Sequence, residues 1–221
     1  MLQSPQQHSI ESNAAHSSVV GETRYAKKKV LAIEAAAIVF ANKGFHGATT
    51  EDIASELGIK QGSLYYYFSS KEEALRQVCE YGFENYVAQM QKIFSRSQPF
   101  EAKMYSIVSS HLSRYRQKSN ALKVHNDQRL YLSKDKRGRL KELGTAYRQL
   151  LETTLGEGVE QGVLRADIDL HFTAYSIIGL CNAWGGNLIR DESIDLFDTT
   201  ESCANLILRG VLSAQQIGTE Y

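Results

Sequence analysis

Residues 49–75 read TTEDIASELGIKQGSLYYYFSSKEEAL, and this stretch decides the fold. Thr49 is a favoured N-cap residue, and its spacing to Asp52 resembles a capping box with Asp in place of Glu. Gly58 can adopt the left-handed conformation that ends a helix and turns the chain sharply. A second short helix is predicted over residues 61–67. The stretch therefore predicts a helix-turn-helix.

The outward face of the second helix carries side chains that suit DNA better than a protein core. Gln can bond two ways to an adenine edge, and Ser can bond to several bases. Lys and Tyr reach phosphates. Three consecutive tyrosines cannot all point inward from one helix, which argues against an ordinary bundle turn. The residues predicted to contact DNA are Lys60, Gln61, Gly62, Ser63, Tyr65, Tyr66 and Lys71, with Thr49 and Thr50 on the backbone.

A family resemblance follows from three segments, AIEAAAIVFANKGF, TTEDIASELGI and GSLYYYFSSKEEAL. Residues 32–75 resemble the DNA-binding domain of the tetracycline-repressor (TetR) family of bacterial regulators. The third segment is close to that family's G-[ST]-L-Y-x-[YH]-F-x-[ST]-K-[ED]-x-L pattern. Glu51 departs from the family, which often has a DNA-contacting or neutral residue there. It either caps the helix dipole or accepts a hydrogen bond from a cytosine amino group.

The resemblance implies an all-α protein with a three-helix helix-turn-helix domain at its N-terminus and a helical ligand-binding and dimerisation bundle after it. Residues 1–22 are rich in Ser and Gln without periodicity, and they predict a disordered arm. We expect the DNA-binding domain over residues 23–70 and the bundle over residues 71–214. The sequence contains only two prolines, which suits an all-helical protein.

Apolar spacing and capping signals predict the helices of the bundle. Their expected positions are residues 70–94, a helix beginning at Pro99, and residues 121–132, 136–161, 170–188 and 196–212. In the family that the sequence resembles, the last two helices of each subunit pack into a four-helix dimer interface. A homodimer would present two recognition helices to half-sites about 34 Å apart, as a palindromic double-stranded operator requires.

The resemblance also implies a small, largely apolar effector held among the bundle helices. Effector binding would favour a conformer that fits DNA poorly, which is a shift in population. Inward-facing aromatic and polar residues are the candidates, although each such residue is more often ordinary core or surface than a ligand contact. The candidate effector contacts are Tyr86, His111, Tyr115, His125, Arg129, Tyr131, Tyr147 and Trp184.

A narrower resemblance concerns the branch of the family that responds to acyl-CoA thioesters. In that branch a helix ending in Gly-x-[LF]-[RK]-x-D-x-D is common, and residues 162–169 read GVLRADID. A basic patch could meet the CoA phosphates while the acyl chain enters the bundle. The alternatives are a solvated positive face or a surface for DNA or a partner. The basic patch consists of Lys134, Lys136, Arg137 and Arg139.

The remaining sequence features narrow the classes of function. The sequence contains no G-x-S-x-G, H-E-x-x-H, C-x-x-C or P-loop motif, so we expect no enzyme, cofactor or metal site. The net charge is zero, and the three cysteines are far apart, which suits a reducing cytoplasm. We expect no signal peptide and no membrane span, hence a cytoplasmic regulator associated with the nucleoid when bound to DNA. The alternative is a DNA-bound protein whose bundle binds a protein partner: a closed cavity would favour a sensor, and an exposed apolar patch would favour a partner.

Overall fold

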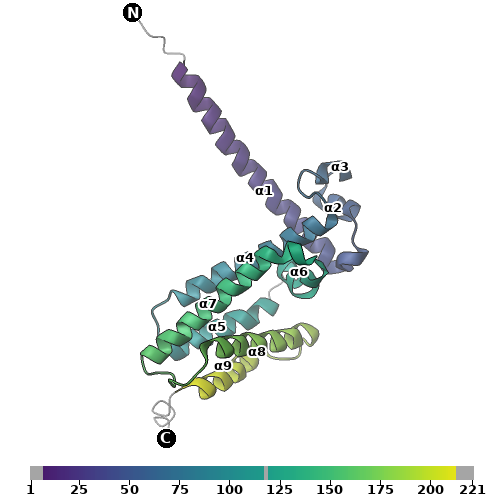
Figure 1. The fold of residues 1–221 in the computed structure, drawn as a ribbon. Coiled ribbons are helices and arrows are strands. Elements are labelled where there is room, and N and C mark those ends of the chain that lie inside the picture. The colour runs from purple at the N-terminus through teal and green to yellow at the C-terminus, as the bar shows by residue number, and fades with distance from the viewer. Residues whose placement is uncertain (1–6, 117–118, 213–221) are drawn as a thin grey trace, which may run out of the picture. The chain divides into compact units, whose positions relative to one another are not determined.

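The computed structural model describes residues 7–116 and 119–212 (Figure 1). These residues form helices and contain no β-strand. The predicted all-α class is confirmed. The chain divides into two compact units, residues 1–78 and 79–221. The division falls after Val78, whereas the sequence analysis placed it after residue 70.

The described residues of the N-terminal unit form three helices and the beginning of a fourth. Their bounds are α1 (Gln7–Gly47), α2 (Thr50–Leu57), α3 (Gln61–Leu64) and α4 (Lys71–Phe94). The core is built from small and aromatic residues of α1, such as Ala36 and Phe40, and from Ile53 and Leu64, all nearly or fully buried. Leu75 adds the first turns of α4 to this core, which explains why they belong to the N-terminal unit.

Helix α1 begins at Gln7, within the N-terminal arm expected over residues 1–22. The disorder of that arm stays a prediction. No proline interrupts the sequence between Gln7 and the core of α1, so nothing in the chain itself ends the helix there. The first six residues of the predicted arm lie outside the described part of the chain.

The predicted turn between α2 and α3 is present in detail. Oγ1 of Thr49 accepts the Asp52 N–H at 3.1 Å, and the Asp52 carboxylate accepts the Thr49 N–H at 2.9 Å, which completes the capping box. Gly58 has a φ of 71°, and the N–H of Ile59 donates to the carbonyl of Ala54 at 2.9 Å. This is the hydrogen-bonded C-terminal turn that favours glycine.

Helix α3 is shorter than predicted. It ends at Leu64, and residues 65–67 form a turn rather than a further helical turn. The N–H groups of Tyr67 and Phe68 both donate to the Leu64 carbonyl, at 2.9 and 3.1 Å. The chain is thereby compact enough for Phe68 to return to the core, where it is 2% exposed.

The C-terminal unit contains the rest of α4 and a bundle of further helices. Their bounds are α5 (Phe100–Arg116), α6 (Asn120–Gln128), η1 (Arg129–Tyr131), η2 (Lys134–Arg137), α7 (Gly138–Glu160), α8 (Leu170–Arg190) and α9 (Leu196–Val211). The helix predicted over 121–132 is thus two elements, and the one predicted over 136–161 begins with a 3-10 turn. The other predicted helices are present within a few residues of their expected bounds.

Helix α5 lies at the centre of the bundle, where it packs on both α8 and α9, while α7 packs on α8. The inward face of α5 is buried, and it includes Met104, Ile107 and Leu112, each at most 1% exposed. On α8 the inward position is held by Gly185: a Cβ there would lie 2.1 Å from the Tyr115 ring. A glycine is therefore required where α5 and α8 approach each other.

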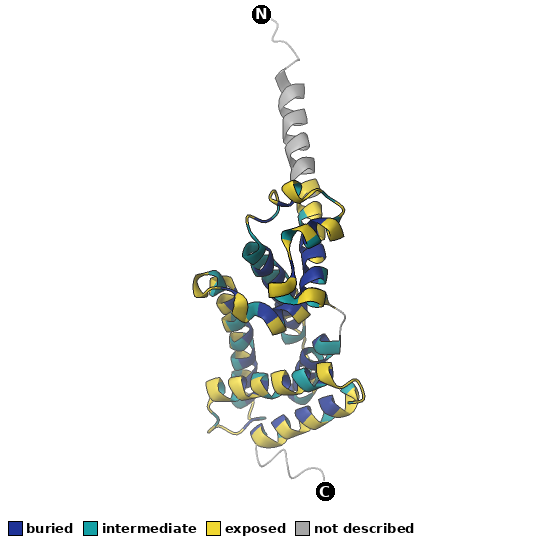
Figure 2. Cartoon of the chain, turned by 90° about the vertical axis from the view of Figure 1, so that its right-hand side faces the viewer, coloured by how far each residue is buried: buried dark blue, intermediate teal, exposed yellow. Residues whose placement is uncertain are grey.

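The outer sides of α8 and α9 are exposed (Figure 2), and they carry large apolar side chains. Phe172 and Tyr175 of α8 are 70% and 56% exposed, and Phe197 and Leu206 of α9 are 64% and 63% exposed. Scattered apolar residues are ordinary on a protein surface, whereas several of them on two adjacent helices are typical of an interaction surface. Among the described residues, no helix is both long and apolar enough to span a bilayer.

Candidate functional site

The outward surface of α3 collects the residues predicted to contact DNA. Tyr65 and Tyr66 are 58% and 79% exposed, while Leu64 on the opposite side is 2% exposed. Lys60, Gln61 and Gly62 are exposed as well, and Ser63 is half-buried. The helix-turn-helix thus directs one apolar side chain inward and a row of hydrogen-bonding groups outward, as groove recognition requires.

Two of the predicted DNA contacts are joined to each other. Nε2 of Gln61 donates to Oγ1 of Thr50 at 2.9 Å, so the first residue of α3 is held by the first residue of α2. The amide of Gln61 keeps its oxygen and its second N–H for another partner. Those two groups are the ones that pair with an adenine edge.

The tyrosine turn after α3 is supported by α1. The Tyr25 hydroxyl donates to the Tyr66 carbonyl at 3.4 Å, and its ring stacks on Tyr67 at 6.2 Å. Lys29 donates to the carbonyl of Tyr67, and its ammonium lies 4.5 Å from the centre of the Phe68 ring. Burial lowers the pKa of Lys29. Lys29 is therefore a structural lysine, and the turn is fixed in place before any ligand arrives.

Lys71 has a structural role beside the one predicted. Its ammonium donates to the Ala48 carbonyl at 3.0 Å and lies 4.7 Å from the centre of the Phe45 ring. The side chain connects the first turn of α4 to the segment between α1 and α2. An ammonium has three donors, so its predicted phosphate contact stays a prediction.

The carboxylate of Asp52 is the local negative charge at the start of α2. The hydrogen bond from Lys43, at 2.7 Å, followed by those from Thr49, lowers its pKa to about 2. Asp52 therefore remains ionised and keeps the N-terminal turn of α2 capped. Glu51, whose role the sequence left open, is exposed beside it.

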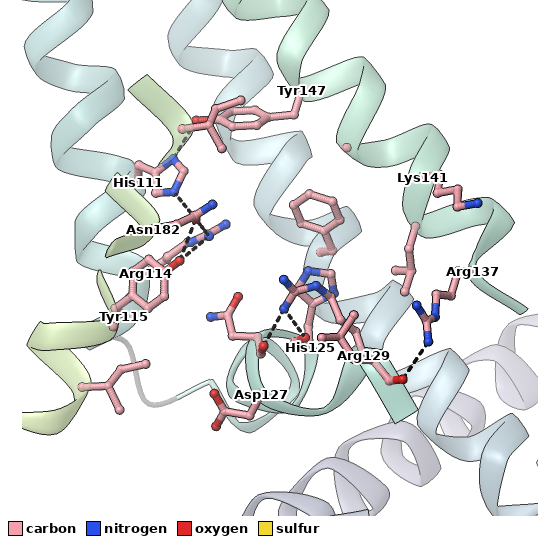
Figure 3. A pocket seen from close by; sticks show the side chains of 18 residues that line it. His111, Arg114, Tyr115, His125, Asp127, Arg129, Arg137, Lys141, Tyr147 and Asn182 are labelled. Carbon is pink, nitrogen blue, oxygen red and sulfur yellow. Dashed lines mark hydrogen bonds between the residues drawn. The ribbon is translucent and has the colours of Figure 1, made fainter. Parts of the chain in front are cut away.

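A cavity of about 470 Å³ lies in the C-terminal unit, among α4 to α8 (Figure 3). Five of the eight predicted effector contacts line it: His111, Tyr115, His125, Arg129 and Tyr147. Apolar residues complete the wall, among them Phe83, Leu140 and Ile178. Eleven of its eighteen lining residues are polar or charged and five are apolar, so the wall combines an apolar part with a larger polar part than most small-molecule sites have.

The other three predicted contacts lie elsewhere. Tyr86 is one layer behind the wall, where its hydroxyl lies 3.2 Å from that of Tyr147. Tyr131 and Trp184 are 51% and 39% exposed and do not line the cavity. Trp184 was assigned to the inward seam of α8, but the adjacent Gly185 takes the inward position because the Tyr115 ring presses against it.

His111 is buried at the centre of a hydrogen-bond network. Its Nε2 lies 3.0 Å from Oδ1 of Asn182, and its Nδ1 lies 2.9 Å from the Tyr147 hydroxyl. Burial and the charge of Arg114 hold the pKa of His111 well below its usual range, so the ring is neutral. Nε2 then donates to Asn182, and Nδ1 accepts from Tyr147.

Arg114 is a functional candidate that the sequence analysis missed. It is 7% exposed and donates to the Tyr115 hydroxyl at 2.7 Å and to Oδ1 of Asn182 at 3.0 Å. Its guanidinium carbon lies 4.5 Å from the Tyr86 ring centre and 4.7 Å from that of Tyr115. The available signal was its place three residues after His111, on the same side of a helix.

A second group of cations lines another part of the cavity. Arg137 donates to the carbonyls of Leu130 and Leu132, at 2.7 and 2.8 Å, and Lys141 lies one helical turn further along α7. Arg129 donates to the carbonyl of His125 at 3.2 Å. Figure 3 shows Arg137 and Lys141 on the opposite side of the cavity from Arg114.

The predicted basic patch is divided by the structure. Arg137 lines the cavity, whereas Arg139 pairs with Glu84 at 2.9 Å and Glu142 at 3.3 Å outside it. Lys134 and Lys136 belong to η2 and do not line the cavity. Lys141, which was not part of the predicted patch, lines the cavity together with Arg137.

His125 contributes a neutral ring to the wall. It stacks on Phe83 with 4.5 Å between ring centres. Burial, with the charges of Arg129 and Arg114, lowers the pKa of His125 to about 3. The cavity thus has positive charge at its arginines and Lys141, an acidic residue at Asp127, and no charge at its two histidines.

Two family models match the chain. The one described as "Bacterial regulatory proteins, tetR family" matches residues 32–78. The one described as "Tetracyclin repressor-like, C-terminal domain" matches residues 97–185. Together they cover more than half of the chain, and they fall on the helix-turn-helix and on the bundle that holds the cavity.

Curated relatives and solved structures are similar over most of the chain. The "Fatty acid metabolism regulator protein" of Bacillus subtilis (strain 168) is 23% identical over 183 residues, 81% of this chain and 93% of its own. The "HTH-type transcriptional repressor KstR2" of Rhodococcus jostii (strain RHA1) is 29% identical over 139 residues, 62% of this chain and 68% of its own. The structure of FadR from Bacillus subtilis in complex with stearoyl-CoA shares the fold, with a TM-score of 0.73 and 22% identity over 82% of this chain and 98% of that one.

Proposed function

Because the chain belongs to the tetracycline-repressor family of bacterial transcriptional regulators, we propose that it is a repressor released from a palindromic operator by an acyl-CoA thioester. The observation that carries the effector class is the cavity in the bundle. Its wall is apolar along Phe83, Leu140 and Ile178, and it is positively charged at Arg137 and Lys141. An acyl chain and the phosphates of CoA match these two kinds of surface.

The DNA-binding half of the proposal rests on the outward face of α3. Gln61 and Ser63 would read base edges, and Tyr65, Tyr66 and Lys60 would reach phosphates; the exposure of this face supports both roles. The cations available for phosphates are Lys60 and Lys71 of the helix-turn-helix and Arg24, Lys27 and Lys28 of α1, while the net charge of the whole chain is zero. Binding is therefore expected to depend strongly on salt despite that neutrality.

Relatives supply independent support for the effector class. One curated relative is named as a regulator of fatty acid metabolism, and a solved structure with the same fold was determined in complex with stearoyl-CoA. The identities of 22–23% are low, so the exact acyl group does not transfer to this chain. The chemistry of the cavity wall is the support for the effector class that comes from this chain itself.

The proposed dimer uses the exposed apolar faces of α8 and α9. Phe172, Tyr175 and Leu206 would be covered by the same residues of a second copy, as a two-fold interface requires. The same patch is the feature that would favour the alternative, a bundle that binds another protein. The cavity favours the effector-binding regulator, because a bundle that only binds another protein does not require a cavity lined by charged residues.

In the proposed mechanism the effector changes the population of two dimer conformations. It binds the conformer in which the two recognition helices no longer match adjacent half-sites, and it must prefer that conformer to release DNA. The polar network of His111, Asn182 and Tyr147 connects α5, α8 and α7 around the cavity. An occupant of the cavity therefore contacts the helices that form both the pocket wall and the proposed dimer surface.

The test begins with selection of genomic fragments by the purified full-length protein. The recovered fragment is then used in gel shifts with stearoyl-CoA, free CoA and stearate. We expect a palindromic site, and release by the thioester at much lower concentration than by either of its parts. Replacement of Arg137 and Lys141 together by Met should weaken release, whereas Arg139→Met, outside the cavity, should not. Equal release by stearate and stearoyl-CoA would overturn the assignment to thioesters.

A further inference from the structure

Arg114 is a buried cation that no described carboxylate neutralises. Its polar partners are the neutral Tyr115 hydroxyl and Asn182 amide, and the rings of Tyr86 and Tyr115 flank its guanidinium. Its Nε has no hydrogen-bond partner. The side chain nevertheless lines the cavity while only 7% of it is exposed.

Other arginines of the same unit are compensated. Arg148 pairs with Glu152 at 2.6 Å, and Arg116 donates to three backbone carbonyls near the end of α8. Buried charges in proteins are normally paired, because removal of an ion from water is costly. The two aromatic rings offset part of that cost for Arg114. They do not supply a negative charge.

The neighbouring acceptor is already saturated. Oδ1 of Asn182 accepts from Arg114, from the Tyr115 hydroxyl at 2.9 Å and from Nε2 of His111 at 3.0 Å. Three donors therefore share one acceptor, the side-chain oxygen atom of Asn182. An anion that enters the cavity would supply both the missing negative charge and further hydrogen-bond acceptors.

We infer that Arg114 forms a subsite for a carboxylate at the end of the effector's acyl chain that is remote from CoA. This inference rests on the proposed effector site. Arg137 and Lys141 lie on the other side of the cavity and would take the CoA end (Figure 3). The effector class is then the mono-CoA thioester of a dicarboxylic acid, with an anion at both ends of an apolar chain.

The experiment compares ligands that differ only at the remote end. Decanedioic acid mono-CoA thioester and decanoyl-CoA are titrated into the full-length protein by calorimetry. We expect the carboxylate-ended thioester to bind about tenfold more tightly, or better, as for a buried charge-assisted hydrogen bond. A second pair without CoA, decanoate and decanol, is compared by the rise in melting temperature, with decanoate expected to raise it more.

Three variants assign any preference to Arg114. Arg114→Met should abolish or invert the preference for the carboxylate in both ligand pairs. Arg114→Lys, which keeps the charge, should retain part of it and serves if the Met variant fails to fold. Arg139→Met removes an arginine that pairs with Glu84 outside the cavity, and it should leave the preference unchanged.

The outcomes separate this inference from the proposed function. Thioesters that bind equally well with methyl and carboxylate ends, and alike in Arg114→Met, would leave the repressor proposal standing and overturn the subsite. A loss of both thioesters in Arg114→Met would mean that Arg114 binds a neutral carbonyl, which also overturns it. If neither thioester binds but decanoate still exceeds decanol only when Arg114 is present, the acyl-CoA proposal fails and the carboxylate subsite holds.

Discussion

Gln61 donates a 2.9 Å hydrogen bond from Nε2 to Oγ1 of Thr50, so the side chain proposed to read bases is oriented by the first residue of the preceding helix. An oriented side chain loses less freedom when it binds a base. The amide oxygen and the second N–H remain for an adenine edge. The relationship makes Thr50 a positioning residue for Gln61, in addition to its predicted backbone contact.

Thr50→Val keeps the shape of the side chain but removes the acceptor of this hydrogen bond. We expect Gln61→Ala to reduce discrimination at one operator position by about 1–3 kcal/mol. Thr50→Val should have a smaller effect at the same position, about 0.5–1.5 kcal/mol. The double variant should cost less than the sum. Operator selection followed by gel shift measures all three, and an unchanged selected site for Thr50→Val would contradict the positioning role.

Lys71→Met should weaken binding to all DNA sequences alike and reduce the slope of log affinity against log salt by about 1. It should also lower the melting temperature, because Lys71 donates to the Ala48 carbonyl. Lys92→Met, in the exposed part of α4, is the matched control and should change neither quantity. A loss of stability without any change in the salt slope would show that Lys71 is purely structural.

Gly185→Ala should destabilise the bundle, since the new Cβ would lie 2.1 Å from the Tyr115 ring. Such overpacking costs about 1–3 kcal/mol. Gly179→Ala in the same helix meets nothing within 4 Å and should be neutral or stabilising by about 0.5–1 kcal/mol. Thermal unfolding of the two variants gives the comparison. Equal melting temperatures would mean that Tyr115 moves aside without cost.

Leu206→Glu should convert the proposed dimer into a monomer, because it places a charge in the middle of an apolar face that is 63% exposed in the single chain. The affinity for the operator should fall because the dimer is lost. Leu31→Glu is a comparable change on α1, at a side chain that is 55% exposed, and should leave the oligomeric state as it was. Native mass analysis decides, and a Leu206→Glu protein that remains dimeric would place the interface elsewhere.

Stability should fall on acidification because of the two buried histidines. The pKa values of His111 and His125 are lowered from 6.5, that of His125 to about 3. Below pH 6.5 the unfolded chain therefore binds protons that the folded chain does not, and each histidine lowers the free energy of unfolding by about 1.4 kcal/mol per pH unit. Denaturant titrations between pH 7 and pH 5 should show a shallower fall for His125→Asn. The same slope in both proteins would contradict burial as the cause.

The sequence predicted the features that depend on near neighbours in the chain. The capping box at Thr49 and the left-handed Gly58 needed only local spacing, and both are present. It did not reveal that Gly185 rather than Trp184 faces inward, because that choice depends on the ring of Tyr115 from another helix. Arg114 and Asn182 were missed for the same reason: the burial of Arg114 and its pairing with Asn182 arise from the packing of α5 against α8.

The saturated oxygen of Asn182 has an evolutionary consequence. An Asn codon becomes an Asp codon by a single base change, and Asn182→Asp would give Arg114 a permanent negative partner within the chain. Such a protein would gain an ion pair, and its own carboxylate would occupy the subsite. It would therefore be more stable but would no longer respond to the effector. Descendants of this regulator that no longer answer to their metabolite are therefore one mutation away, and position 182 is the place to look for them among natural isolates.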